Sequence, residues 1–323
     1  MTVAVIGGAG YIGAHVVRAL TARGEAVVVV DDLSTGATSR LGGHRVHVLN
    51  IASEGAEAGL SGLFREDGVD AVVHLAAKKQ VGESVERPLW YYRQNVVGTE
   101  NVLRAAVQAG VRDVVFSSSA AVYGSPAQSY VSEETPARPI NPYGETKLVG
   151  EWLSAGSARA RGLRTTALRY FNVAGTASAR LVDQGTFNLI PIVMQRLRAG
   201  RPVQIYGDDY PTPDGTCVRD YVHVVDLANA HLAALDAMRS AEGGSHRVYN
   251  VGTGTGFSVR EVVNVVASVS GREVTTETVP RRAGDPPALT AAVGRIHAEL
   301  GWKAALDLED MVRSAWDAGE AAR

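Results

Sequence analysis

The chain has 323 residues, of which 46% are hydrophobic, enough for one large α/β domain and a smaller lobe. Its 32 Lys and Arg residues nearly balance its 34 Asp and Glu residues, and no basic run is long enough to follow a phosphate backbone, which argues against nucleic acid as a partner. The single cysteine, Cys217, excludes an intramolecular disulfide, and the sequence opens without a signal peptide or a long apolar stretch, which indicates a cytoplasmic protein without a membrane partner.

The first apolar segment, residues 3–6, predicts a buried strand that leads directly into a glycine-rich run. This run, GGAGYIG, fits both Gly-x-Gly-x-x-Gly and Gly-x-x-Gly-x-x-Gly. Glycines at these positions allow backbone N–H groups to approach a pyrophosphate at the start of a helix that we expect to begin near Tyr11. The sequence therefore predicts a dinucleotide cradle that includes Gly7, Gly10, Tyr11, Ile12 and Gly13.

The second predicted strand, residues 26–30, ends at Asp31, which lies 18 residues after Gly13. A carboxylate at this position can accept hydrogen bonds from both hydroxyls of the adenosine ribose. It also repels a 2′-phosphate, and no arginine follows it directly. We therefore expect the cofactor to be NAD rather than NADP.

Four further apolar strands are predicted, and helical segments at 88–110 and 141–160 separate the later ones. Buried strands that alternate with helices are typical of a doubly wound parallel sheet of the Rossmann type. After residue 172 the pattern loosens, and a polar loop, a helix candidate and turn-rich segments predict a smaller α/β lobe that binds substrate. We expect an NAD-binding domain at 1–172 and a mainly substrate-binding lobe at 173–323, with segments near 218–252 returning to the first domain. The four strands are expected at 45–49, 70–75, 113–117 and 164–170.

Three serines, residues 117–119, end the fifth strand at the sheet edge where such folds bind ligands. The next helix carries Tyr143 and Lys147 on one face, because they are four residues apart, and the Asn-Pro pair at 141–142 fits its start. A hydroxyl, a phenol and an ammonium group beside a nicotinamide are suited to moving a proton and a hydride. The lysine charge and the nicotinamide are expected to lower the phenol pKa from about 10. We predict that Ser119, Tyr143 and Lys147 are catalytic.

Longer motifs in the chain resemble those of the extended short-chain dehydrogenase/reductase superfamily and, within it, the UDP-galactose 4-epimerases. The resemblance covers essentially the whole chain, and the run YPTPDGTCVRDYVHV is more specific than any glycine pattern. The other motifs are KKQVGESVERPLWYYRQNVVGT (78–99), FSSSAAVYG (116–124), RYFNVAG (169–175) and PRRAGDP (280–286).

The resemblance implies reversible NAD-dependent interconversion of UDP-glucose and UDP-galactose through a transient 4-keto sugar. Tyr143 would be the base that takes the O4 proton, Ser119 would hydrogen-bond near the sugar 4-hydroxyl, and Lys147 would also hold the nicotinamide ribose. Asn50 stands where relatives commonly have Asp, and its side-chain oxygen can still accept from the adenine amino group. The other implied cofactor residues are Ile51, Lys79, Asn95, Ser117, Tyr143 and Tyr170.

In the smaller lobe the resemblance implies a site for the UDP moiety and the sugar. Asn172 and Asn188 resemble residues that meet the sugar and diphosphate, and Tyr206 resembles the aromatic residue against the uracil. Two arginines would clamp the pyrophosphate, and a carboxylate would bind the uridine ribose. The remaining implied substrate residues are Lys79, Leu189, Arg219, Arg282, Asp285 and Leu289. A homodimer through the helices around 88–110 and 141–160 is also implied.

Departures from the family pattern leave the preferred sugar open. Ala121 replaces a second hydroxyl, the loop 175–186 is short, and Leu289 is intermediate between the aromatic and small residues of relatives. UDP-N-acetylglucosamine and UDP-glucuronate are therefore alternative substrates, and a catalytically silent NAD-binding regulator is an alternative from another class. A 4,6-dehydratase is disfavoured because Ala120 and Ala121 stand where such enzymes carry an Asp-Glu pair.

No metal site is expected from the sequence. Of the eight histidines, His44 and His47 lie close together, but they flank a predicted strand and have no cysteine or histidine partners at metal-ligand spacing.

Overall fold

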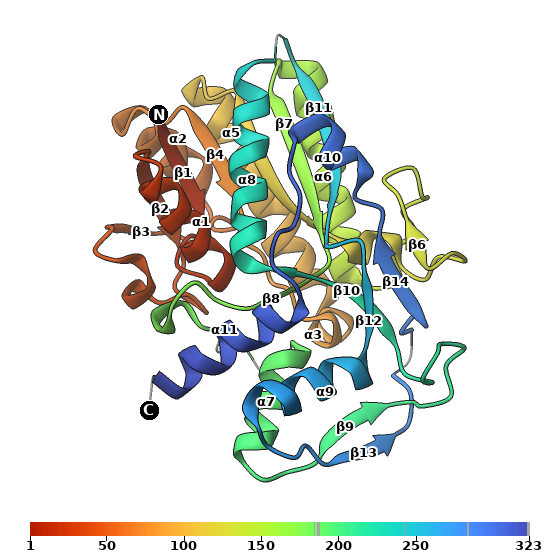
Figure 1. Ribbon diagram of the computed structural model, residues 1–323. Coiled ribbons are helices and arrows are strands. Elements are labelled where there is room, and N and C mark those ends of the chain that lie inside the picture. Colours follow the sequence, from red (N-terminus) through yellow and green to blue (C-terminus); the bar gives the residue numbers. More distant parts are fainter. Residues whose placement is uncertain (184, 186–187, 242, 283, 322–323) are drawn as a thin grey trace.

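A parallel sheet of seven strands forms the centre of the described part of the chain (Figure 1). The computed structural model describes residues 1–183, 185, 188–241, 243–282 and 284–321. The strand order is β11–β7–β5–β4–β1–β2–β3. The chain adds β2 and β3 on one side of β1 and then continues with β4 on the other side, and such a switch point places a ligand crevice outside the carboxyl ends of β1 and β4. The strands are β1 (Thr2–Ile6), β2 (Ala26–Asp31), β3 (Val46–Val48), β4 (Ala71–His74), β5 (Asp113–Ser119), β7 (Arg164–Tyr170) and β11 (Ser245–Val251).

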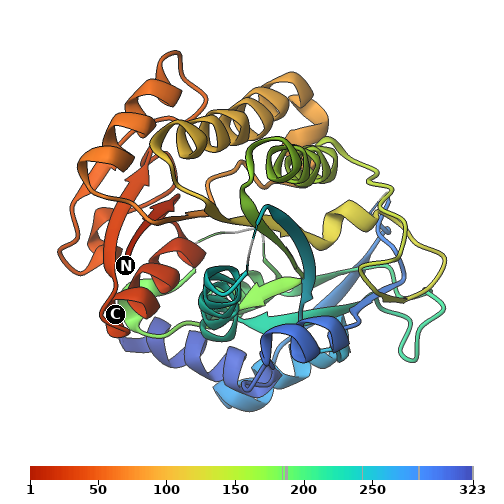
Figure 2. The same cartoon turned by 90° about the horizontal axis from the view of Figure 1, so that it is seen from above.

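Helices cover both faces of this sheet (Figure 2). Helices α1 (Tyr11–Ala22) and α8 (Val224–Arg239) pack together on one face around a core that includes Val5, Leu20 and Leu227. The opposite face carries a second core that includes Leu60, Val102 and Val114. Its helices are α2 (Ala56–Glu66), α5 (Gly98–Ala109) and α6 (Pro142–Arg161). Between α2 and α5 the chain forms α3 (Val81–Glu86), α4 (Pro88–Tyr91) and the π-helix η2 (Tyr92–Val97).

Two smaller sheets lie at the carboxyl end of the large one. Strand β10 is central to one of them and pairs in parallel with β8 and β14 and antiparallel with β12. The elements are β6 (Tyr130–Val131), β8 (Asn172–Ala174), β9 (Val203–Tyr206), β10 (Val218–His223), β12 (Gly256–Ser258), β13 (Thr276–Val279), β14 (Ala288–Ala291), α7 (Leu189–Arg198), α9 (Val259–Ser270), α10 (Gly294–Leu300) and α11 (Leu308–Ala321), with short 3₁₀ turns η1 (Thr38–Leu41), η3 (Ala120–Tyr123) and η4 (Ala179–Leu181).

The predicted Rossmann-type fold is confirmed, and the six predicted strands appear in the large sheet. The boundaries differ where packing extends an element: β5 runs to Ser119 rather than stopping at residue 117. The predicted helix over 88–110 is divided into α4, the π-helical turn η2 and α5. The sheet's seventh strand, β11, pairs with β7 along its whole length.

Two segments from the sequence analysis fall partly outside the described residues. The loop 175–186 is described except at residues 184 and 186, and the motif 280–286 except at residue 283. Among the described residues, no helix has both the length and the apolar character needed to cross a membrane. The same residues contain no group of three or more His, Cys, Asp or Glu side chains arranged to hold a metal ion.

Candidate active site

The glycine-rich run forms a tight turn between β1 and α1. Gly7 has a φ of +86°, and Gly10 is the N-cap of α1, which begins at Tyr11 as predicted. A Cβ atom on Gly13 would lie 2.1 Å from the carbonyl oxygen of Gly7, so the first turn of the helix can approach the loop this closely only with glycine at position 13. The turn leaves the helix N-terminus open, as a dinucleotide cradle requires.

Asp31 fixes the second side of this cradle. Its Oδ2 accepts a hydrogen bond from the N–H of Ala9 at 3.0 Å, and its Oδ1 accepts one from the N–H of Leu33 at 2.8 Å. Burial raises the pKa of Asp31 above its usual value, and the two backbone hydrogen bonds oppose that shift. Each oxygen keeps a free lone pair, so Asp31 can still accept from ribose hydroxyls.

The loop after β4 is held by Asn95, whose predicted role was contact with the cofactor. The Oδ1 atom of Asn95 accepts from the N–H of Lys78 at 2.8 Å, and its Nδ2 donates to the carbonyl of Lys78 and to Oγ1 of Thr146. Thr146 in turn donates to the carbonyl of Tyr143 at 2.8 Å. Asn95 therefore ties the cofactor-side loop to the helix that carries the predicted base.

Lys78, which sequence reasoning passed over, faces the end of β2. Its Nζ donates to Oγ of Ser34 at 2.7 Å and lies 3.6 Å from Oδ2 of Asp32. Lys79, the residue that was predicted for the site, is exposed. Asn50 uses its Oδ1 to accept from the N–H of Ala52 within its own turn, 2.9 Å away.

Helix α6 begins as predicted and places the reactive residues. Asn141 caps it by accepting from the N–H of Gly144, and Pro142 occupies its first turn. Lys147 is buried, and its Nζ donates to the carbonyl of Ser117 at 2.7 Å and lies 5.9 Å from the centre of the Tyr143 ring. Ser119, at the end of β5, lies close enough to Tyr143 for its hydroxyl to affect the pKa of the Tyr143 phenol. The structure thus brings the three predicted catalytic residues together.

The pKa of Tyr143 differs from the sequence prediction. Burial raises it above the usual value of 10, and the nearby Ser119 hydroxyl opposes this shift without cancelling it. Burial also lowers the pKa of Lys147 to about 7, which weakens the positive charge expected to favour the phenolate. The expectation of a lowered Tyr143 pKa is therefore wrong for the protein alone, because desolvation acts on both groups.

Ser117 and Tyr170 lie beside the reactive residues, on the sheet face covered by α8. The Tyr170 hydroxyl lies 2.5 Å from Nε2 of His231, and Nδ1 of His231 lies 2.8 Å from the carbonyl of Leu227. Burial lowers the pKa of His231 to about 4, so the ring is neutral, with its proton on Nδ1, and Nε2 accepts from Tyr170. Tyr170 is thereby held in place at the end of β7.

A cavity of about 490 Å³ lies in the smaller lobe, where β8, α7, β9 and β10 supply most of its lining residues. Arg219 donates to Asp285 across 3.3 Å, and the Arg282 guanidinium lies 3.8 Å from the centre of the Tyr206 ring. The cavity brings together seven of the predicted substrate residues, namely Asn172, Asn188, Leu189, Tyr206, Arg219, Arg282 and Asp285. Cavity-lining residues that sequence reasoning missed include Gln195, Gln204, Cys217 and Tyr221.

The other predicted substrate residues do not line this cavity in the described part of the chain. Lys79 is exposed, and Leu289 is buried in a cluster with Val122, Tyr123 and Ala291. Leu289 is paired in register with Arg219, so it lies one strand away from the charged end of the cavity.

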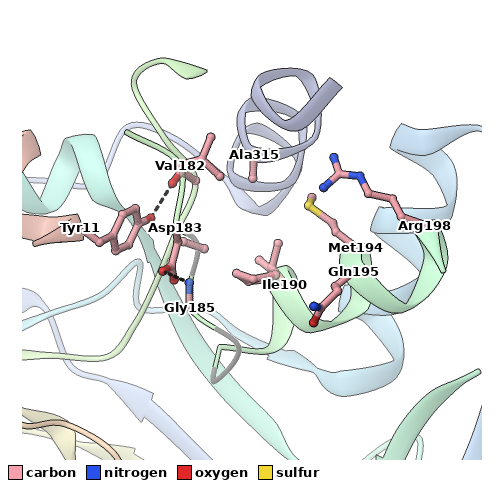
Figure 3. Close-up of a pocket in the computed structure, with 12 residues that line it drawn as sticks. Tyr11, Val182, Asp183, Gly185, Ile190, Met194, Gln195, Arg198 and Ala315 are labelled. Carbon is pink, nitrogen blue, oxygen red and sulfur yellow. Dashed lines mark hydrogen bonds between the residues drawn. The ribbon is translucent and has the colours of Figure 1, made fainter. Parts of the chain in front are cut away.

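A smaller cavity of about 230 Å³ lies beside α7 (Figure 3). It is lined by Tyr11, Asp183, Met194 and Ala315 among others, and it shares Ile190 and Gln195 with the larger one. The Tyr11 hydroxyl donates to the carbonyl of Gly175 at 2.5 Å. This bond ties the start of α1 to the loop that leads into the smaller lobe.

A match to a protein-family model accounts for this combination of cradle, reactive helix and second cavity. The model of the NAD dependent epimerase/dehydratase family matches residues 3–252. The chain belongs to this family. One relative in it is the UDP-glucose 4-epimerase of Azospirillum brasilense, which is 46% identical over 318 residues, covering 97% of this chain and 90% of the relative.

Solved structures of family members show the same fold over the whole length. The UDP-glucose-4-epimerase of Stenotrophomonas maltophila, with bound NAD and formylated UDP-arabinopyranose, has a TM-score of 0.93 at 40% identity, covering 100% of this chain and 98% of that one. The UDP-glucose 4-epimerase of Brucella ovis in complex with NAD has a TM-score of 0.92 at 42% identity, covering 98% and 97%.

Proposed function

We propose that this chain catalyses the reversible, NAD-dependent 4-epimerisation of UDP-glucose and UDP-galactose. The observation that carries the proposal is the grouping of Tyr143, Ser119 and Lys147 at the carboxyl edge of the large sheet, in a chain that also has a dinucleotide cradle and a cavity lined by Arg219 and Arg282. Relatives named for this activity match nearly the full chain at more than 40% identity.

The cradle fits NAD. Gly7 and Gly13 let the loop pack tightly against the residues after β4 and the start of α1, because a Cβ at either position would overlap backbone atoms, and the two oxygens of Asp31 keep lone pairs for ribose hydroxyls. No arginine directly follows Asp31 in the sequence, and its carboxylate repels a 2′-phosphate, which favours NAD over NADP. Bound NAD supplies a reversible acceptor for the hydride on the sugar carbon that bears the reacting hydroxyl.

In this proposal the residues of the chain move the proton. Tyr143 accepts the proton of the sugar 4-hydroxyl and later returns it, while Ser119 hydrogen-bonds the reacting oxygen. An ammonium at Lys147 would stabilise a phenolate at Tyr143, because the Lys147 Nζ lies 5.9 Å from the centre of the Tyr143 ring. Ala120 and Ala121 offer no acid to expel water, which argues against a dehydratase.

The cavity residues hold the nucleotide. Arg219 and Arg282 give paired donors for a diphosphate, Asp285 can accept from ribose hydroxyls, and Tyr206 offers an aromatic face. Asn172 and Asn188 contact the sugar and diphosphate in this proposal. Because the charged side chains gather at the nucleotide end, the sugar is held less firmly and its ketone can turn over.

The organisation of the chain is part of the proposal. We place the NAD-binding domain at 1–172 and the substrate lobe at 173–323, and the pairing of β11 with β7 supports a return of the segment near 218–252 to the first domain. A homodimer is supported by exposed apolar side chains on α4 and α6. A cytoplasmic location stays a prediction.

Separate incubations with three UDP-sugars test the function. UDP-galactose, UDP-N-acetylgalactosamine and UDP-galacturonate are each mixed with the protein, and products are resolved by proton NMR. We expect fastest conversion of UDP-galactose to UDP-glucose. Faster conversion of the second or third sugar would show that the preferred substrate is the corresponding alternative UDP-sugar. If none of the three gives a 4-epimer, the proposed epimerase function is wrong and the alternative of an NAD-binding regulator is favoured.

The proposed role of Tyr143 predicts the behaviour of a Tyr143→Phe variant. The ring and its packing remain, so NAD content and thermal stability should stay close to those of the wild type. Loss of the hydroxyl removes the base, and we expect kcat to fall by a factor of about 10² to 10⁴. Turnover is measured by a coupled UDP-glucose assay, and near-normal turnover would exclude Tyr143 as the base.

A further inference from the structure

A buried ion pair lies beneath the three serines that end β5. Glu151 and Arg169 are only 4% and 6% exposed, and Arg169 donates from Nε to Oε1 at 2.9 Å and from Nη2 to Oε2 at 2.7 Å. Glu151 is on α6 and Arg169 on β7, so the pair joins a helix to the sheet. Neither residue lines the cavities described above.

Glu151 also binds the serine strand directly. The Ser118 hydroxyl donates to Oε1 of Glu151 at 2.5 Å, and Ser118 is the cross-strand neighbour of Arg169. Tyr143, Lys147 and Glu151 are spaced by four residues and share one face of α6. Two successive turns of that face thus hold the strand, Lys147 through the carbonyl of Ser117 and Glu151 through the hydroxyl of Ser118.

Arg169 continues the network to the other side of Ser119. Its Nη1 donates to the hydroxyl of Tyr123 at 2.9 Å, and that hydroxyl donates to Oδ1 of Asn250 at 2.7 Å. Tyr123 ends the turn η3, which begins directly after Ser119, and the Ser119 Oγ accepts from the N–H of Ala121 in that turn at 3.1 Å. The backbone on both sides of Ser119 is therefore anchored to the same ion pair.

Stability alone is a poor reason for this arrangement. Desolvating two charges costs several kcal/mol per ion, and apolar residues of similar volume often stabilise a protein as well or better. Its geometric effect is specific, because it fixes α6, β5, β7 and η3 relative to one another. We infer that Glu151, Arg169 and Tyr123 are positioning residues that set the hydroxyl of Ser119 against the hydroxyl of Tyr143. This inference rests on the proposed function.

The Tyr123→Phe variant tests the network with little change in packing. The ring stays under the Arg169 guanidinium, which lies 4.9 Å from its centre, and two hydrogen bonds are lost. Tyr249→Phe is the matched control, because Tyr249 is a buried tyrosine on the neighbouring β11 whose hydroxyl donates to Glu299, away from Ser119. We expect Tyr123→Phe to lower kcat about tenfold with KM for UDP-galactose unchanged within about twofold, and Tyr249→Phe to leave both unchanged.

A double-mutant cycle with Ser119→Ala separates positioning from general loosening. If Tyr123 acts through Ser119, its removal should lower kcat less than about twofold in the Ser119→Ala background. An equal loss in both backgrounds would overturn the inference, as would a loss in Tyr123→Phe no larger than that in Tyr249→Phe. Ser118→Ala removes the hydrogen bond between Glu151 and the strand but keeps the ion pair. Its loss of kcat should likewise be smaller in the Ser119→Ala background, and this variant replaces Tyr123→Phe in the test if Tyr123→Phe does not fold.

Amide hydrogen exchange gives a readout that does not need turnover. We expect faster exchange at residues 119–123 in Tyr123→Phe than in the wild type or in Tyr249→Phe, because η3 loses its anchor. Equal exchange in all three proteins would overturn the inference. If the wild type epimerises no UDP-sugar, the proposed function fails, while the exchange result still decides whether this network holds the Ser119 segment.

Discussion

At the scale of single residues, Lys147 is a buried charged group that lowers the stability of the fold but serves the proposed reaction. Its ammonium group is buried against the Phe116 and Tyr143 rings and donates to one backbone carbonyl, that of Ser117. Burial lowers its pKa to about 7. A buried lysine with a strongly shifted pKa is typical of a functional site rather than of a stabilising contact.

The shifted pKa of Lys147 predicts how stability changes with pH. Between about pH 7 and 10.5 the unfolded chain binds a proton that the folded protein releases, so this group makes the free energy of unfolding rise with pH in that window. Lys147→Met lacks the rise. We therefore expect the free energy of unfolding of the wild type minus that of the variant to increase between about pH 7 and 9, as measured by urea unfolding.

A matched control for this experiment is Lys303→Met, which removes an exposed lysine. Its unfolding free energy should follow that of the wild type across the same pH range. Parallel curves for wild type and Lys147→Met would contradict the predicted shift. The Lys147→Met variant should also lose most of its turnover near pH 7, where a charged Lys147 can favour the phenolate at Tyr143.

At the scale of elements, the distance between α6 and the serine strand depends on glycines. A Cβ atom on Gly150 would lie 2.3 Å from Cζ of the buried Phe116, and one on Gly144 would lie 2.6 Å from the carbonyl oxygen of Ala121. Both glycines face elements that carry or follow the serines, β5 and η3. The close approach lets Lys147 and Glu151 reach the strand with short hydrogen bonds.

This packing predicts opposite effects for two alanine substitutions in the same helix. Gly150→Ala gains up to about 1 kcal/mol in helix propensity but overpacks against Phe116, which costs about 1–3 kcal/mol, so the variant should be less stable and less active. Gly156→Ala meets nothing within 4 Å and should be about 0.5–1 kcal/mol more stable, with normal turnover. Urea unfolding measures both, and a stabilised Gly150→Ala would show that α6 can move away without loss.

The elements also show what could be predicted from the sequence. The start of α6 and the shared face of Tyr143 and Lys147 follow from local spacing, and the Rossmann-type sheet follows from the alternation of apolar strands and helices. The link from Asn95 to Thr146 and the ion pair of Glu151 with Arg169 join segments far apart in the chain, which local spacing does not reveal. The pKa of Tyr143 was predicted in the wrong direction because burial is a property of packing.

At the scale of the whole molecule, large apolar side chains are exposed on neighbouring helices of one flank. Leu89 on α4 is 83% exposed and Trp152 on α6 is 63% exposed, and Val81 and Val85 on α3 are exposed as well. Helices α3 and α4 both pack against α6, so these side chains belong to adjoining surfaces. Such a concentration marks a contact surface in a chain whose other apolar residues are mostly buried.

The proposed homodimer predicts the effect of a charge at this surface. Trp152→Glu places a carboxylate in the expected interface, where it would be buried without a partner, and we expect the sedimentation-equilibrium mass to fall from that of a dimer to that of a monomer. Tyr130→Glu on β6 changes another exposed aromatic residue, away from these helices, and should leave the mass unchanged. A monomeric wild type would exclude the homodimer. A Trp152→Glu variant that remains dimeric would show that the dimer contact lies on another surface.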